Sequence, residues 1–182
     1  MKKTMKALVI YGTRWGGTVN VAEKIGGALK DEGYFVDVFD ARQSPQNIDS
    51  YDLVIIGSGI RADKWTKETL NFLGKNAGSL KTKKIALFVS CQMADGGKES
   101  QDKAKKLYLE KTAEHYGLKP VEFGFFGGFL DFSKSHGLFV DVLVRVNRNS
   151  LRKNGLDTHK VRDTRDWSII EAWAREVAKT EP

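Results

Sequence analysis

The stretch Lys6-Ala-Leu-Val-Ile-Tyr-Gly-Thr-Arg-Trp-Gly-Gly-Thr18 decides the fold of this chain. Its first half, up to Tyr11, is an apolar run rich in residues that favour β-strands, and it predicts a buried strand. A glycine-rich turn follows, and from Thr18 to Gly33 apolar residues recur at the spacing of a helix. A buried strand that leads through such a turn into a helix is typical of a parallel α/β sheet.

The same alternation of strand and helix continues along the chain. Further strands are predicted over Tyr34–Phe39, Leu53–Ile56, Lys84–Ser90 and Pro120–Phe126, with Gly57 ending the third strand. Further helices are predicted over Lys64–Asn76, Lys98–Tyr116 and Asp166–Thr180, with Asp166 as the N-cap of the last. Continuous apolar strands separated by helices indicate a sheet that is covered on both faces. Right-handed crossovers then favour an α/β fold with a doubly wound, five-stranded parallel sheet in the order 2-1-3-4-5.

A long insertion before the last helix, residues 127–165, breaks this alternation. Its middle, Leu138–Val146, is apolar except for one aspartate. Basic residues dominate its second half: Arg145, Arg148, Arg152, Lys153, Lys160, Arg162 and Arg165. Long connections often carry function, so two interpretations stay open. In the first, residues 138–165 contact an anionic membrane surface or a quinone. In the second, the apolar part is a helix that packs on the core of its own domain.

The size of the chain favours one domain, residues 1–182. Its apolar runs are shorter than the roughly 18 residues of a transmembrane helix. The apolar run after the basic first residues is also too short for a signal peptide, so we expect a soluble, cytoplasmic protein. A single cysteine, Cys91, excludes an internal disulfide and a cysteine-ligated zinc or iron–sulfur site within one chain.

The chain carries a net charge of +7, which suits an acidic partner, an anionic surface or nucleic acid. No nucleic-acid recognition motif accompanies the charge, so we expect no nucleic-acid partner. The 3 histidines lie in different regions, and we therefore expect no metal site.

Ligands of open α/β sheets bind outside the carboxyl ends of the strands, where the strand order reverses. The loops predicted to meet there are Gly12–Thr18, Gly57–Lys64, Cys91–Gly97 and Gly127–Asp131. Each loop contains glycine, which allows a ligand to approach the backbone closely. This edge of the sheet is therefore the predicted binding site.

Three kinds of phosphate loop compete for this site. The spacing of Gly12 and Gly17 matches a P-loop, but Thr18 stands where a P-loop has its lysine. The run Gly57-Ser-Gly-Ile-Arg-Ala62 matches a dinucleotide fingerprint, yet it follows the third strand and lacks the acidic residue about twenty positions later. A cradle of hydroxyls and backbone amides at a helix start fits best, and it suits the terminal phosphate of FMN.

The first loop resembles the phosphate loop T-x-T-G-x-T of flavodoxins. It matches at Thr13, Gly16 and Thr18, and Trp15 replaces the middle threonine. Three further segments resemble the flavodoxin-like branch that contains the flavodoxin-type protoporphyrinogen oxidases: Gly57–Trp65, Gly127–Lys134 and Asp166-Trp167. The resemblance implies a flavodoxin-like fold, with FMN as the cofactor.

The resemblance also implies which residues hold FMN. They are Thr13, Arg14, Trp15, Gly16, Gly17, Thr18, Ser58, Gly59, Ile60, Arg61, Ala62, Cys91, Gln92, Met93, Gly127, Gly128 and Asp131. Two tryptophans, Trp15 and Trp65, are equally compatible with flavin contact and with packing. At the end of a strand, Cys91 is expected to be a buried small hydrophobe rather than a redox thiol.

Two functions are compatible with this resemblance. The first is an FMN-binding redox protein that transfers electrons between protein partners, with the basic surface selecting acidic ones such as a ferredoxin or a reductase. The alternative is a protoporphyrinogen IX dehydrogenase that passes electrons from the porphyrinogen through FMN to a quinone.

Overall fold

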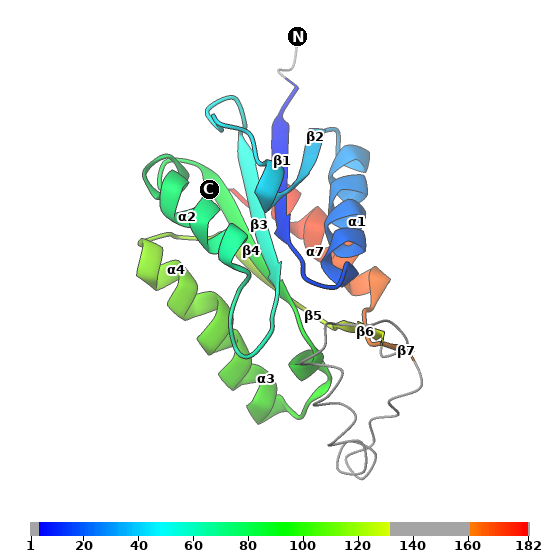
Figure 1. The fold of residues 1–182 in the computed structure, drawn as a ribbon. Coiled ribbons are helices and arrows are strands. Elements are labelled where there is room, and N and C mark those ends of the chain that lie inside the picture. The colour runs from blue at the N-terminus through cyan, green and yellow to red at the C-terminus, as the bar shows by residue number, and fades with distance from the viewer. Residues whose placement is uncertain (1–3, 132–160, 182) are drawn as a thin grey trace, which may run out of the picture.

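The computed structural model describes residues 4–131 and 161–181 (Figure 1). Five parallel strands form one sheet in the order β2-β1-β3-β4-β5, which confirms the predicted topology. The strands are β1 (Lys6–Gly12), β2 (Phe35–Asp40), β3 (Leu53–Gly59), β4 (Lys84–Ser90) and β5 (Glu122–Phe126). The order reverses at β1, because β2 pairs with one side of it and β3 with the other.

Helices cover both faces of the sheet, as Figure 1 shows. One face is covered by α1 (Gly17–Asp31) and α7 (Trp167–Lys179), and the other by α2 (Lys67–Leu80), α3 (Lys98–Lys105) and α4 (Lys111–Tyr116). A π-helical turn, Lys106–Glu110, joins α3 to α4, so the helix predicted over Lys98–Tyr116 is interrupted rather than regular. The predicted N-cap of α7 is confirmed, because the Asp166 carboxylate accepts hydrogen bonds from the N–H groups of Ser168 and Ile169.

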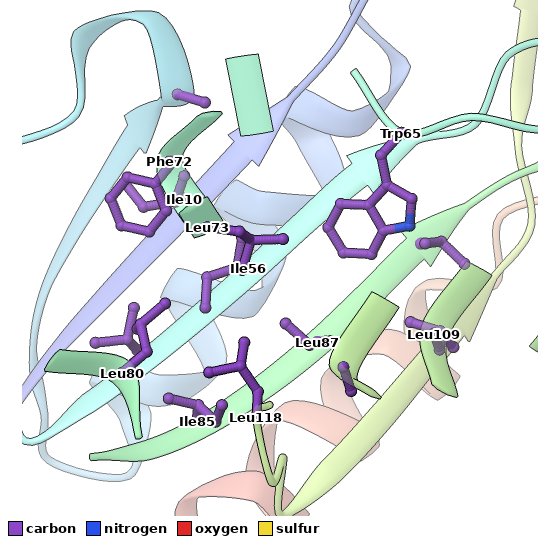
Figure 2. Close-up of a cluster of buried hydrophobic side chains, with 14 of the residues drawn as sticks. Ile10, Ile56, Trp65, Phe72, Leu73, Leu80, Ile85, Leu87, Leu109 and Leu118 are labelled. Atoms are coloured by element: carbon purple, nitrogen blue, oxygen red, sulfur yellow. The ribbon is translucent and has the colours of Figure 1, made fainter. Parts of the chain in front are cut away.

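The two faces of the sheet are apolar because side chains of a strand alternate between faces. In β1, Ala7 and Val9 pack with α1 and α7, whereas Leu8 and Ile10 pack with α2 and the π turn. All four are fully buried. Figure 2 shows the second cluster, where residues of the central strands meet those of α2 and of the chain around the π turn.

The structure corrects the predicted end of β3. The strand continues through Gly57 to Gly59. A Cβ atom on Gly57 would lie 2.1 Å from the Phe88 ring, so the glycine allows the neighbouring strand's aromatic side chain to cross it. This glycine therefore serves packing inside the sheet rather than ending the strand.

The structure also corrects the predicted start of α2, which begins at Lys67 instead of Lys64. Trp65 precedes the helix, is 6% exposed and lies in the core cluster of Figure 2. Its indole N–H donates to the backbone carbonyl of Tyr108 at 2.7 Å. The sequence left flavin contact and packing open for Trp65, and the structure supports packing.

The two ends of the insertion pair with each other. β6 (Phe129–Asp131) and β7 (Val161–Asp163) form an antiparallel two-stranded sheet, which was not predicted because strands of three residues carry no usable periodicity. Leu138–Val146 and the basic residues up to Lys160 lie outside the described residues. The interpretation of residues 138–165 as a membrane or quinone contact therefore stays a prediction.

Candidate functional site

A hollow opens at the carboxyl ends of β1, β3 and β4, where the strand order reverses. We call it the switch-point hollow. It is lined by Thr13, Arg14, Trp15, Gly17, Thr18, Gly59, Ile60, Arg61, Ser90, Cys91, Gln92, Gly128 and Phe129. Except for Ser90, these residues come from the four loops that the sequence predicted to converge, and most of the predicted site residues are among them.

The remaining predicted residues do not line this hollow. Ser58 is fully buried, and its hydroxyl accepts a hydrogen bond from the Thr66 N–H at 2.9 Å. Ala62 lines a neighbouring hollow, and Met93 contacts Tyr108. The other three are Gly16 at the start of α1, Gly127 against Thr164, and Asp131 at the end of β6.

Two lining residues were missed, Ser90 and Phe129. Ser90 ends β4, and a polar residue at the end of an apolar run was the signal that could have identified it. Phe129 lies in the predicted loop Gly127–Asp131 but was not among the predicted site residues. It pairs with β7 as part of β6, a pairing for which the sequence offers no local signal. A Cβ atom on Gly17 would lie 2.8 Å from the Phe129 Cβ, so the glycine allows this strand to approach the phosphate loop.

The loop after β1 leaves the first turn of α1 open. Gly16 has a φ of 83°, a left-handed conformation that favours glycine, and its N–H donates to the Thr13 hydroxyl at 2.9 Å. Among the described residues, no hydrogen bond uses the N–H of Gly17 or Thr18. Unpaired N–H groups at the positive end of a helix form an anion site.

The loop after β4 presents an amide that lacks partners. Both the nitrogen and the oxygen of the Gln92 side chain are buried, and neither has a hydrogen-bond partner within residues 4–131 and 161–181. Each buried, unpaired polar group costs about 1–3 kcal/mol. A ligand with both donors and acceptors on one edge would satisfy this amide, because Gln92 lines the switch-point hollow.

Beside this amide, Cys91 is buried, which confirms its predicted packing role. Burial is the main cause that raises the pKa of its thiol, so the protonated form dominates at neutral pH. Its backbone N–H donates to the Phe126 carbonyl at 3.0 Å and so holds the loop after β4 beside the end of β5.

The loop after β3 contains a tight turn, Arg61–Lys64, in which the two end residues exchange backbone hydrogen bonds of 3.1 Å. Both central residues have positive φ, 46° for Ala62 and 59° for Asp63. Positive φ at both positions is the pattern of a type I′ turn, which glycine and asparagine normally occupy. A left-handed alanine costs about 1–2 kcal/mol, so contacts elsewhere must hold this turn in place.

Tyr108, from the π-helical turn, supplies that support. Its hydroxyl donates to the Asp63 carboxylate at 2.5 Å, and its oxygen lies 3.3 Å from the Met93 sulfur. Burial first, and the nearby Asp63 carboxylate second, raise the pKa of Tyr108, so the phenol stays protonated and remains a donor. One buried side chain therefore joins the loops after β3 and β4 to the helix that covers them.

The turn also places Arg61 at the rim of the hollow. Its guanidinium carbon lies 5.2 Å from the centroid of the Trp15 ring, within the range of a cation–π contact. Trp15 is half-buried and lines the hollow, in contrast to Trp65. The loops after β1 and β3 thus meet through this pair.

The far end of the insertion is fixed to the phosphate loop by Arg165, whose side chain is 6% exposed. Its guanidinium pairs with the Asp163 carboxylate at 2.6 Å and donates to the Gly17 carbonyl at 2.8 Å. It also lies over the rings of Phe129 and Trp167, 4.7 and 4.6 Å from their centroids. The sequence groups Arg165 with the basic residues of a surface segment. The structure corrects this assignment, because the guanidinium of Arg165 contacts groups of its own domain.

Comparison with known proteins identifies the family. A family model described as a flavodoxin domain matches residues 8–139, which include the phosphate loop, most of β1 and the other four strands of the main sheet. The chain belongs to the flavodoxin domain family. Flavodoxins bind FMN at the switch point between β1 and β3, and the unpaired amides at the switch-point hollow fit that cofactor. This flavodoxin domain is therefore an FMN-binding redox protein.

Three known proteins are similar to this chain. The protoporphyrinogen IX dehydrogenase [quinone] of Escherichia coli is 25% identical over 96% of this chain and 95% of its own length. An uncharacterized protein of Methanocaldococcus jannaschii is 31% identical over 72% of this chain and 87% of its own length. The two-electron reduced flavodoxin of Megasphaera elsdenii is similar in structure, with a TM-score of 0.52 and 22% identity over 65% of this chain and 84% of its own.

Within the part of the chain that the structure describes, no helix combines the length and apolarity needed to cross a bilayer.

Replacing Ala62 by glycine tests the strain in the Arg61–Lys64 turn. We expect Ala62→Gly to raise the free energy of unfolding by about 0.5–1 kcal/mol, because glycine adopts positive φ without steric cost. Urea denaturation measures the change. The matched control is Ala172→Gly on the exposed face of α7, which should lower stability by about 1 kcal/mol. Equal losses from both variants would show that the turn is unstrained.

Replacing Arg165 by lysine tests the link between the insertion and the phosphate loop. Lysine keeps the charge but cannot pair with Asp163, stack on two rings and reach Gly17 at once, so stability should fall by about 1–3 kcal/mol. FMN affinity should fall with it. Arg175→Lys is the control, because its side chain is 39% exposed in its ion pair with Asp31, and it should change stability by less than about 1 kcal/mol.

The ion pair between Arg165 and Asp163 also predicts that the stability of the protein depends on pH. Hydrogen bonding to Arg165 is the main cause that holds the pKa of Asp163 below its usual value. A carboxyl whose pKa is lowered by folding stabilises the protein above its unfolded-state pKa, about 3.9, and that contribution is lost as the pH falls further. Arg165→Lys should therefore lose less stability than the parent as the pH falls below about 4.

Proposed function

We propose that this flavodoxin domain holds FMN in the switch-point hollow and transfers electrons between protein partners. The open first turn of α1 is the observation that carries the proposal, because the N–H groups of Gly17 and Thr18 have no acceptor among the described residues. A phosphate needs such donors. The loop Gly12–Thr18 contains no lysine, and the described residues include no group of three or more acidic, histidine or cysteine side chains that could hold a metal ion. A site of this kind suits a monophosphate better than a nucleoside triphosphate.

In this proposal the phosphate of FMN lies on Thr13–Thr18, and its ring system lies between the loops after β3 and β4. Gly59, Ile60 and Arg61 contact one side of the ring, and the Gln92 amide bonds to its polar edge. Gly128 closes the site from the loop after β5. When bound, FMN accepts or donates one or two electrons, and the protein controls its potential and the access of partners.

A second function is supported by a relative whose similarity extends over almost the whole chain. The Escherichia coli protoporphyrinogen IX dehydrogenase [quinone] matches 96% of this chain, so the similarity extends over the insertion. The Megasphaera elsdenii flavodoxin covers 65% of the chain. A similarity to this dehydrogenase that includes the insertion supports oxidation of a porphyrinogen with a quinone as acceptor.

FMN binding is tested with purified protein stripped of cofactor. We expect FMN to bind with visible flavin absorption, and riboflavin, which lacks the phosphate, to bind about 100-fold more weakly, because two charge-assisted hydrogen bonds are lost. Thr18→Val should weaken FMN binding about tenfold without changing the affinity for riboflavin. Thr82→Val, at the opposite edge of the sheet, is the control. Equal affinity for FMN and riboflavin would contradict the proposed phosphate site.

The two functions are separated by turnover. If the second holds, protoporphyrinogen IX with a soluble quinone should yield protoporphyrin at a rate that depends on bound FMN, followed by porphyrin fluorescence. Deleting residues 138–152 should abolish this turnover while FMN affinity is retained. The electron-carrier function predicts instead that reduced ferredoxin reduces the bound FMN and that the deletion has no effect on this rate. Porphyrin formation that is equally fast without FMN would exclude the second function.

A further inference from the structure

A second hollow lies beside the switch-point hollow, between the loops after β1 and β3 and the start of α2. It is lined by Arg14, Arg61, Ala62, Lys64, Trp65, Lys67 and Leu70. Four of these residues are cations and none is acidic, so we call it the basic hollow. Arg14 and Arg61 line both hollows, which places the positive charge directly beside the proposed flavin site.

Within residues 4–131 and 161–181, no ion pair neutralises the cations of the basic hollow. Among the described residues, no salt bridge includes Arg14, Lys64 or Lys67, and all three are exposed. Nearby Arg42 provides the contrast, because its Nε and Nη2 donate to the Asp40 carboxylate at 2.9 and 2.7 Å. An anion that enters the basic hollow would therefore meet available positive charge.

Two acids lie close to the hollow without lining it. Asp63 is in the Arg61–Lys64 turn and accepts the Tyr108 hydroxyl. Glu68 lines a third hollow, on the side of Asp40 and Arg42. The charge of the basic hollow is thus reduced but not cancelled by its surroundings.

Lys64 and Lys67 occupy positions that do not favour the stability of the fold, whereas Arg61 also contacts the Trp15 ring. Lys67 is the first residue of α2, where the positive end of the helix dipole disfavours a cation. Arg61 and Lys64 are the ends of the strained turn, which the Tyr108–Asp63 hydrogen bond fixes. A cation that does not stabilise the fold, and that lies on a rigid part of the backbone, is more readily explained by a role in binding than by a structural role.

We propose that the basic hollow is the docking site for carboxylate side chains of an acidic redox protein. The proposal rests on the proposed function, because an electron donor must approach the flavin that the adjacent hollow would hold. Electron-transfer complexes are small and transient, so a few charges beside the flavin decide their rate of formation. A protein partner is favoured over a membrane because a lipid headgroup supplies no electrons to a flavin.

The test uses FMN-loaded protein and a plant-type ferredoxin, a strongly acidic one-electron donor, as the probe. Each reduced ferredoxin gives one electron to the bound FMN and is itself oxidised, and stopped-flow absorbance measures the second-order rate constant. We expect this constant to fall steeply with ionic strength. The double variant Lys64→Gln/Lys67→Gln should lower it about tenfold at low ionic strength and converge with the parent at high salt.

The control is Lys119→Gln/Lys179→Gln, which changes the net charge equally at the amino-terminal edge of the sheet, where both lysines are exposed. Equal loss of rate in both double variants would overturn the docking site, because net charge alone would explain it. A loss of binding to phosphatidylglycerol vesicles, without any change in ferredoxin rate, would also overturn it in favour of a membrane contact. Failure of the parent protein to bind FMN would instead refute the proposed function, and absorbance distinguishes that outcome at the start.

Discussion

The central position of β1 in the sheet is the constraint on which the site depends. Since β2 and β3 pair with opposite sides of β1, the helices that follow β1 and β3 lie on opposite faces, and their loops diverge at the carboxyl edge. The diverging loops leave a crevice that no crossover fills. The positive end of α1 faces this crevice, and its first N–H groups have no partner among the described residues. The strand order therefore creates both the crevice and its affinity for an anion.

Two contacts from distant parts of the chain hold the loops around that crevice. Arg165, at the end of the insertion, fixes the first turn of α1 through the Gly17 carbonyl, and Tyr108, in the π turn, fixes the loop after β3 through Asp63. Both are buried polar groups with satisfied partners, which is how a protein gives a loop one conformation. The site is thus supported by side chains that do not line it.

Positive charge is concentrated on the surface around the proposed flavin site. Arg14 and Arg61 border the switch-point hollow and continue into the basic hollow, so a positive field covers the approach to the proposed flavin site. A reduced, anionic cofactor would be stabilised in such a field, and acidic partners would be attracted to it. The same residues would therefore influence both the potential and the choice of partner.

The sequence by itself determined the strands, the helices and the phosphate loop, because apolar periodicity and glycine-rich turns are local properties of the chain. It could not place Phe129, Trp65 or Arg165, whose positions depend on contacts between segments that are distant in sequence. Gly57 shows the same limit: locally it ends a strand, yet beside the Phe88 ring it is the residue that lets the strand continue. Tertiary structure decided these positions because packing and buried hydrogen bonds outweigh local preference.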